Sequence, residues 1–142
     1  MKSIHTDKKL VIAGGSSDAD AFANELKELA KVDDRIIFTG FVQGQLLDEL
    51  YSNAFIYTLP SDLEGMPLSL LEAMNYGNCC LISDIPECAE VVEDKVVTFK
   101  KSDVNDLKDK LEWLLSHEDA VHTYKENATD FIISILSITT DV

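Results

Sequence analysis

Short apolar runs alternate with amphipathic stretches along most of the 142-residue chain. Runs that are apolar throughout predict strands buried on both faces of a sheet, whereas apolar residues that recur every three or four positions predict helices that pack by one face. The predicted strands are 10–13, 35–39, 54–59, 79–83 and 96–99, the first of them a buried strand. The predicted helices are 19–30, a short helix around 46–50, 68–76, 104–115 and 117–135.

Residues at the ends of these helices agree with their bounds. Ser16 or Ser17 can cap the first helix, and Asp103 can cap the helix that begins at residue 104, because their side-chain oxygens accept from free backbone amides. Pro67 can occupy the first turn of helix 68–76, and Gly77 can end it, because proline has no amide to lose and glycine tolerates the left-handed conformation.

The alternation of strands and helices predicts an α/β fold. Such an order favours right-handed βαβ units and a parallel sheet with helices on both faces, here a three-layer, doubly wound, Rossmann-like sheet. We expect a polar N-terminal tail at residues 1–8 and one domain over residues 9–142, in which 117–142 form a helical tail.

Composition narrows the classes of partner. Twelve basic against 26 acidic residues give a net charge of −14 without a basic cluster, which excludes nucleic acid as a favoured ligand. No apolar run reaches the about 20 residues that a bilayer requires, and the polar segment Met1–Lys9 is unlike a signal peptide. We therefore expect a cytoplasmic protein.

The cysteines and carboxylates give no sign of a metal site. Cys79, Cys80 and Cys88 lack the spacing of metal ligands, so we expect three small buried hydrophobic side chains in a reducing compartment. No group of carboxylates converges as a cation site, and we expect no metal cofactor.

In doubly wound sheets, ligands bind beyond the carboxyl ends of the strands. The loops that follow the predicted strands there are 14–17, 40–44, 60–67 and 83–84, and they are rich in glycine and small polar residues. Glycine permits a close approach of the backbone to a ligand, although every α/β domain has such loops. Gly14-Gly15 alone is not a dinucleotide fingerprint.

Glu72 is the most informative residue of the helix after the third loop, because its neighbours Leu70, Leu71, Ala73 and Met74 are apolar. Helical side chains lean toward the helix N-terminus, so its carboxylate could lie at the ligand mouth and accept hydrogen bonds from a diol such as a ribose. Alternatively, it could cap backbone donors or pair with a buried cation, since a lone buried carboxylate is costly. The residues alone leave both interpretations open.

The segment 64–74, followed by Gly77, resembles the signature of the glycosyltransferase group 1 family (family four, GT-B architecture). Its mark is two glutamates separated by seven residues, which Glu64 and Glu72 match. The resemblance extends from Lys9 to Leu115 through segments that follow in the family's order: 10–15, 37–41, 50–54, 59–61, 81–86 and 90–92.

This resemblance implies transfer of a sugar from a nucleotide-diphosphate donor with retention at the anomeric carbon. It assigns Glu64 to the hydroxyls of the donor sugar, as the catalytic candidate, and Glu72 to the ribose hydroxyls. It implies that amides around Gly65, Met66 and Leu68 face the sugar and the diphosphate. The loops at Gly14 and Gly15 and at Gly40, Phe41 and Val42 would line the nucleotide pocket, with the base near the second loop.

The sequence departs from the family pattern in two respects. The family's first strand and helix of this domain, which carry an arginine and a lysine that clamp the diphosphate, have no match here. The family's N-terminal acceptor-binding domain, with its histidine, has none either, and we expect His5, His117 and His122 to be surface residues. Stabilisation of the leaving diphosphate needs such cations, so we expect a donor-binding domain that cannot transfer sugar alone.

Three partner arrangements follow from these departures. The chain could work with an N-terminal acceptor-binding domain or a separate subunit, and a longer protein could lie at a membrane surface. It could form homo-oligomers through an uncovered sheet edge. Alternatively, it is a non-catalytic partner subunit or a degenerate remnant that acts by association.

The sequence does not identify the donor base, the sugar or the acceptor. A receiver-like signalling domain is disfavoured, because the first strand is not followed by the acidic cluster that such domains use for magnesium.

Overall fold

The computed structural model describes residues 3–15, 21–92 and 94–140, with side chains to residue 137. The chain divides into two compact units, residues 1–48 and 49–142. The boundary falls inside the helix α2 (Gln45–Asn53). One domain over residues 9–142 stays a prediction, and the two units are described separately.

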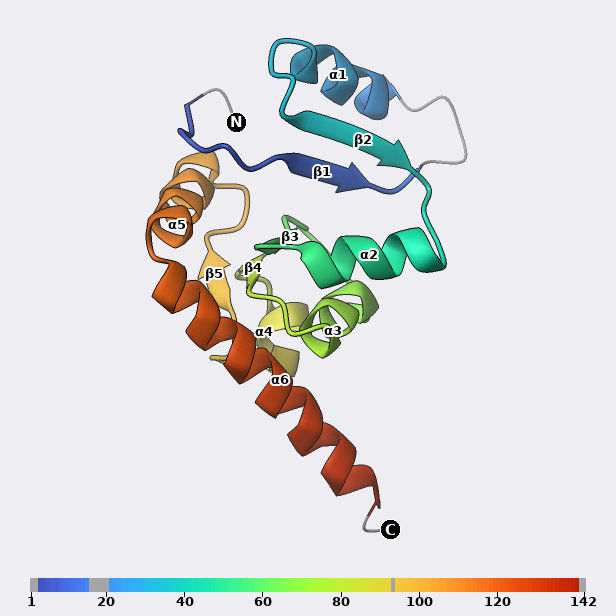
Figure 1. The fold of residues 1–142 in the computed structure, drawn as a ribbon, viewed down its shortest axis with the longest axis vertical. Helices are drawn as coiled ribbons and strands as arrows, with labels where there is room; N and C mark the ends of the chain where they lie inside the picture. The colour runs from blue at the N-terminus through green and yellow to red at the C-terminus, as the bar shows by residue number, and fades with distance from the viewer. Residues whose placement is uncertain (1–2, 16–20, 93, 141–142) are drawn as a thin grey trace. The chain divides into compact units, whose positions relative to one another are not determined.

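The N-terminal unit contains β1 (Leu10–Ala13), α1 (Ala21–Ala30) and β2 (Ile36–Gly40). The two strands pair in parallel, with Leu10 opposite Ile36, and the register shifts after Ile12. Parallel neighbours need a crossover connection, and α1 lies within that connection (Figure 1). The strand bounds agree with the prediction to within one residue. The predicted helix cap at Ser16 or Ser17 lies outside the described residues.

The prediction that strand 10–13 is buried is wrong. Leu10 is 37% and Val11 39% exposed, and α1 has no buried residue. A two-stranded sheet with one helix offers too little surface to cover both faces of a strand. The residues of β1 are therefore apolar, but the described residues of the structure do not cover them.

Arg35 fixes the segment that precedes β1. Its guanidinium donates through Nη1 to the carbonyls of Ile4 (3.1 Å) and Thr6 (2.9 Å), and through Nε and Nη2 to the carboxylate of Asp33 (both 2.8 Å). The hydrogen bond from Arg35 lowers the pKa of Asp33 to about 2. The polar segment ahead of β1 is thus held at the start of β2 by hydrogen bonds from Arg35, whose charge is paired with the buried carboxylate of Asp33.

The C-terminal unit is built on a three-stranded parallel sheet in the order β3 (Tyr57–Leu59), β4 (Cys80–Ser83), β5 (Val97–Phe99). Its helices are α3 (Leu68–Asn75), α4 (Pro86–Val92), α5 (Val104–Ser116) and α6 (Glu118–Thr140) (Figure 1). Parallel strands joined by helices confirm the α/β fold class. Strand β3 begins three residues later than predicted, and Phe55 and Ile56, which precede it, pack against the core of this unit.

The core lies on both faces of the central strand β4. Cys79 and Leu81 face a cluster with residues of β5, α5 and α6: Val97, Phe99, Leu114 and Val121. Alternation along the strand sends Cys80 and Ile82 to the other face, where α3 contacts β4. The three cysteines are buried, as predicted, and burial raises the pKa of Cys79 to about 11.

Two predicted helix ends are confirmed in detail. Gly77 has φ +69° and donates to the carbonyl of Met74, while the Asn78 amide donates to that of Ala73, which together form a Schellman motif after α3. Asp103 accepts from the amides of Asn105 and Asp106 and caps α5.

Other helix predictions need correction. Val104, the first residue of α5, was expected on the apolar face of this helix with Leu107, Leu111, Leu114 and Leu115, but it is 76% exposed. Pro67 is the residue before α3 rather than part of its first turn. The sequence did not predict α4, and α6 continues past residue 135, within the predicted helical tail 117–142. Among the described helices, none combines the length and the apolar character that crossing a membrane requires.

Candidate functional site

The carboxyl ends of the three parallel strands place three loops at one edge of the C-terminal sheet. Side chains tie these loops together. The hydroxyl of Ser102, after β5, donates to Asp62, after β3 (2.9 Å), and the amide of Lys101 donates to the carboxylate of Asp84, after β4 (2.7 Å). Ser102 has φ 60°, which is uncommon for a residue with a side chain. The edge is therefore a connected surface of loops.

Glu64 lies in the loop between β3 and α3. Its half-buried carboxylate accepts a short hydrogen bond from the hydroxyl of Ser61, which fixes one carboxylate oxygen and leaves lone pairs on the other. Gly65 and Met66 follow on the surface, and the Met66 side chain is 70% exposed. The loop thus presents a carboxylate and two exposed residues at the sheet edge.

Pro67 forms an inverse γ-turn at the start of α3. Its φ of −78° and ψ of 64° match that turn, and the Leu68 amide donates across it to the Met66 carbonyl (2.8 Å). The amides of Leu70 and Leu71 donate to the Pro67 carbonyl. Of the three predicted ligand-facing amides, that of Leu68 is therefore used internally, whereas within the described residues the amides of Gly65 and Met66 make no backbone hydrogen bond.

Glu72 lies in the second turn of α3 with its side chain exposed. Its Oε2 accepts a hydrogen bond from the hydroxyl of Tyr51 (3.2 Å). The cost of burying a lone carboxylate therefore does not arise. The alternative interpretation required a backbone donor or a buried cation, and in the parts of the chain that the structure describes neither contacts this carboxylate.

The tyrosines beside Glu72 were not predicted from the sequence. Tyr51 is buried and stacks on Tyr76, with ring centroids 5.3 Å apart, and its ring lies 6.0 Å from that of Tyr57. The hydroxyl of Tyr57 donates to Ser69 Oγ (2.9 Å). Tyr51 occurs in segment 50–54, which supported the resemblance, but no spacing rule links it to a glutamate 21 residues later.

In the N-terminal unit, the structure brings the predicted glycine loops together. The Gly14 amide donates to the Gly40 carbonyl (2.9 Å), and a Cβ on Gly15 would lie 3.3 Å from the Phe41 amide nitrogen. Gly14 and Gly40 have φ of +137° and +69°, which side chains rarely adopt. Phe41 is 76% exposed and Val42 half-buried. These five residues form one surface at the carboxyl ends of β1 and β2.

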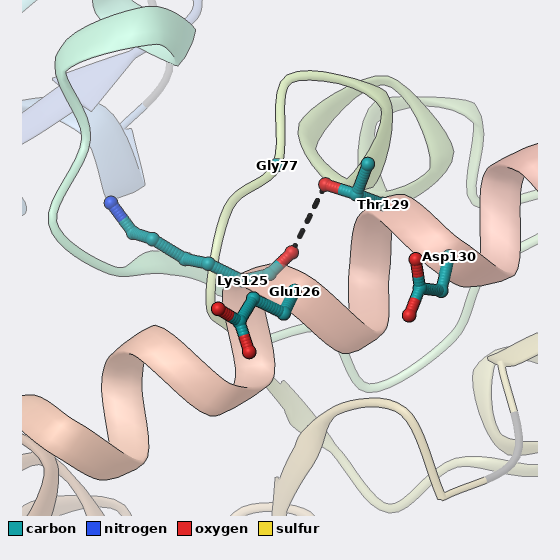
Figure 2. A pocket seen from close by; sticks show the side chains of 5 residues that line it. All are labelled: Gly77, Lys125, Glu126, Thr129 and Asp130. Atoms are coloured by element: carbon teal, nitrogen blue, oxygen red, sulfur yellow. Dashed lines mark hydrogen bonds between the residues drawn. The ribbon is translucent and has the colours of Figure 1, made fainter.

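A shallow depression of about 410 Å³ lies elsewhere in the C-terminal unit and contains none of the predicted site residues. Figure 2 shows its lining, Gly77 and four residues of α6: Lys125, Glu126, Thr129 and Asp130. Lys125 Nζ donates to the Ala54 carbonyl (3.1 Å), so the cation of this depression holds the chain after α2. Its lining includes none of the predicted site residues, and we assign it no ligand.

The model of the glycosyl transferases group 1 family matches residues 1–131. An uncharacterized glycosyltransferase of Methanocaldococcus jannaschii is 34% identical over 88 residues, which cover 62% of this chain and 22% of that protein. The serotype-specific mannosyltransferase WbdA of Escherichia coli is 34% identical over 94 residues, 66% of this chain and 12% of that protein. The chain thus spans about a fifth or less of the length of these curated relatives.

Solved structures share the fold. The HepE protein of Anabaena in complex with UDP-glucose has a TM-score of 0.80, with 14% identity over 98% of this chain and 42% of that one. At this identity the likeness concerns the fold, and it matches the α/β architecture of GT-B glycosyltransferases.

Proposed function

The chain belongs to the glycosyl transferases group 1 family, and on this premise we propose that it is the part of a retaining glycosyltransferase that binds the nucleotide-diphosphate sugar donor. One observation carries the proposal. Glu72, the second glutamate of the family motif, is exposed in the second turn of α3, and a hydrogen bond from Tyr51 holds one of its two oxygens. A fixed, exposed carboxylate is suited to accept two hydroxyls of a ribose.

The motif's other residues take the roles that the family resemblance implies. Glu64 would accept from hydroxyls of the donor sugar, and its contact with Ser61 supports a fixed orientation of its carboxylate. Amides of Gly65 and Met66 would donate to the diphosphate, since they have no backbone acceptor among the described residues. The Leu68 amide would join them only after it releases the Met66 carbonyl.

In the N-terminal unit we propose a nucleotide-binding surface at Gly14, Gly15, Gly40, Phe41 and Val42. The contact between the two loops and the positive φ of Gly14 and Gly40 support close backbone approach of a ligand there. The exposed ring of Phe41 is a suitable surface for stacking of a nucleobase. The complex of HepE with UDP-glucose is a precedent for a donor of this class on this fold.

Transfer itself needs more than this chain. An acceptor must be held beside the donor and water excluded, and the relatives that transfer sugars are several times longer than the matched segment. We propose that the 142-residue chain binds the donor without transferring the sugar, and that an acceptor-binding domain or subunit completes the enzyme. A cytoplasmic location stays a prediction.

A non-catalytic role in protein association is the second candidate. The observation that favours it is the exposure of large apolar side chains in the N-terminal unit, among them Phe22 (63%), Leu29 (66%) and Val32 (61%). This candidate predicts a stable oligomer whose formation is indifferent to nucleotide.

Calorimetric titration of UDP, GDP and ADP into the chain tests the proposal. We expect one nucleotide to bind selectively and its affinity to fall at least about tenfold in Glu72→Ala, because hydrogen bonds to the ribose are lost. The matched control is Glu90→Ala, which removes an exposed carboxylate from α4 and should leave affinity unchanged. Absence of binding to wild type, with an oligomer unaffected by nucleotide, would favour the association role instead. Retention is tested separately, by NMR of the anomeric configuration of the product of a complete enzyme.

A further inference from the structure

The position of Tyr51 is fixed by contacts on two sides. Tyr51 is 9% exposed, and its ring stacks on that of Tyr76 with an interplanar angle of 18°. Its backbone carbonyl accepts a hydrogen bond from the side chain of Asn78 (3.0 Å). Ring and backbone are therefore both anchored to α3 and the residues that follow it, and the hydroxyl has little freedom to move.

The Tyr51 hydroxyl has one hydrogen to donate. It lies 3.2 Å from Glu72 Oε2 and 3.4 Å from the carbonyl oxygen of Ser69, so the carboxylate is the nearer and the charged acceptor. Burial and the nearby carboxylate raise the pKa of Tyr51. The phenol therefore stays protonated and remains a donor throughout the pH range in which nucleotides are assayed.

We propose that Tyr51 is a positioning residue for donor binding, and that its hydroxyl orients the Glu72 carboxylate toward the ribose diol. The inference rests on the proposed function of Glu72. An exposed glutamate samples several rotamers, and ordering it on binding costs conformational entropy. A hydrogen bond formed before the ligand arrives removes part of that cost, which is the general effect of preorganisation. With Oε2 engaged by the phenol, Oε1 keeps its lone pairs for the ribose.

Tyr57 provides a matched control in the same aromatic cluster. Its hydroxyl donates to Ser69 Oγ and not to Glu72. Its ring centroid lies 6.0 Å from that of Tyr51, so Tyr57→Phe removes a phenol hydroxyl from the same aromatic cluster. Of these two hydroxyls, that of Tyr51 contacts the Glu72 carboxylate and that of Tyr57 does not, so loss of the Tyr51 hydroxyl should change ribose recognition and loss of the other should not.

The test uses Tyr51→Phe, Tyr57→Phe, Glu72→Ala and the double variant Tyr51→Phe with Glu72→Ala in the 142-residue chain. Each is titrated with UDP, GDP and ADP and with the corresponding 2′,3′-dideoxynucleoside diphosphates. We expect Tyr51→Phe to weaken binding of the preferred ribonucleotide about threefold to tenfold, the usual range for one hydrogen bond. Affinity for the dideoxy nucleotide should be unchanged, and the double variant should bind no more weakly than Glu72→Ala. Tyr57→Phe should change neither affinity by more than about twofold.

The outcomes separate this inference from the proposed function. If Glu72→Ala binds the preferred ribonucleotide more weakly than wild type, but Tyr51→Phe binds it like wild type, donor binding stands and the positioning role is overturned. If Tyr51→Phe weakens ribonucleotide and dideoxynucleotide equally, Tyr51 supports the fold rather than the carboxylate, which also overturns it. If wild type binds none of the three nucleotides, both proposals fail. Thermal unfolding of each variant shows which affinity losses accompany a loss of folded protein.

Discussion

Asn78 donates a hydrogen bond from its side-chain amide to the backbone carbonyl of Tyr51 (3.0 Å), and this bond joins the end of α2 to the end of α3. The same amide group also donates to the Ala73 carbonyl (3.1 Å), and Asn78 is only 1% exposed. Because Tyr51 contacts Glu72, the hydrogen bond from this buried asparagine fixes the backbone of a residue that borders the candidate site.

We predict that Asn78→Ala lowers the free energy of unfolding by about 2 kcal/mol, because two buried side-chain hydrogen bonds, to the carbonyls of Tyr51 and Ala73, are lost. Each carbonyl keeps one backbone donor, the amide of Ala54 for Tyr51 and that of Asn78 for Ala73. Urea denaturation measures the change. Asn53→Ala removes an exposed hydrogen bond to the Glu49 carbonyl and should cost about 0.5 kcal/mol or less. Equal losses in the two variants would contradict the structural role of Asn78.

Gly77→Ala should destabilise the chain for two separable reasons. At φ +69° a side chain costs about 1–2 kcal/mol, and the new Cβ would lie 3.2 Å from Thr129 Oγ1. Denaturation of Gly77→Ala with and without Thr129→Ala measures both parts. The conformational cost should persist when Thr129 is truncated, whereas the steric part should disappear. A full recovery in the double variant would show that backbone strain contributes nothing.

Asp103→Ala should lower the free energy of unfolding by about 1 kcal/mol, because the amides of Asn105 and Asp106 lose their capping acceptor. Asp103→Asn retains a side-chain oxygen and should remain close to wild type. Asp109→Ala, an exposed carboxylate later in α5, is the control for the loss of charge. The thermal unfolding midpoints of the three variants show whether Asp103 stabilises the chain by capping α5. A midpoint for Asp103→Asn as low as that of Asp103→Ala would argue against capping.

The Asp33–Arg35 pair predicts a specific dependence on pH. The pKa of Asp33 is lowered to about 2 from an ordinary value of 3.8, so its stabilising contribution is complete above pH 4 and is lost as pH falls from about 4 to 2. Carbon-13 NMR of the Asp33 carboxyl should show a midpoint of about 2. In Arg35→Gln the midpoint should move toward 4, because the main cause of the shift is removed. An unchanged midpoint in that variant would overturn this assignment.

Local patterns in the sequence predicted the elements that depend on local rules. The cap at Asp103 and the glycine end of α3 follow from the geometry of single turns, and both occur as predicted. The strand bounds agree closely where apolar runs are short and bounded, as at Cys80–Ser83. Helix α4 was missed because its seven residues are too few to establish a helical period.

Features that depend on the rest of the chain could not be predicted. The exposure of β1 depends on which elements cover it, and a run of apolar residues carries no information about that. The contact of Tyr51 with Glu72 joins positions 21 apart through a helix packing that no motif encodes. The use of the Leu68 amide by the Met66 carbonyl depends on the ψ of Pro67, whereas the proline ring fixes only φ.

The buried thiols allow the opening of the C-terminal unit to be measured by the rate of their alkylation. Only thiolates react with alkylating reagents, and Cys79, Cys80 and Cys88 are buried with pKa values raised by desolvation. Alkylation of the native chain should therefore wait for an opening of this unit, and its rate should follow the population of the open form. A loss of about 2 kcal/mol should accelerate it about 30-fold. Mass spectrometry of labelled wild type and Asn78→Ala would thus give the alkylation rate of each cysteine. These rates report how often the part of the C-terminal unit around each cysteine opens.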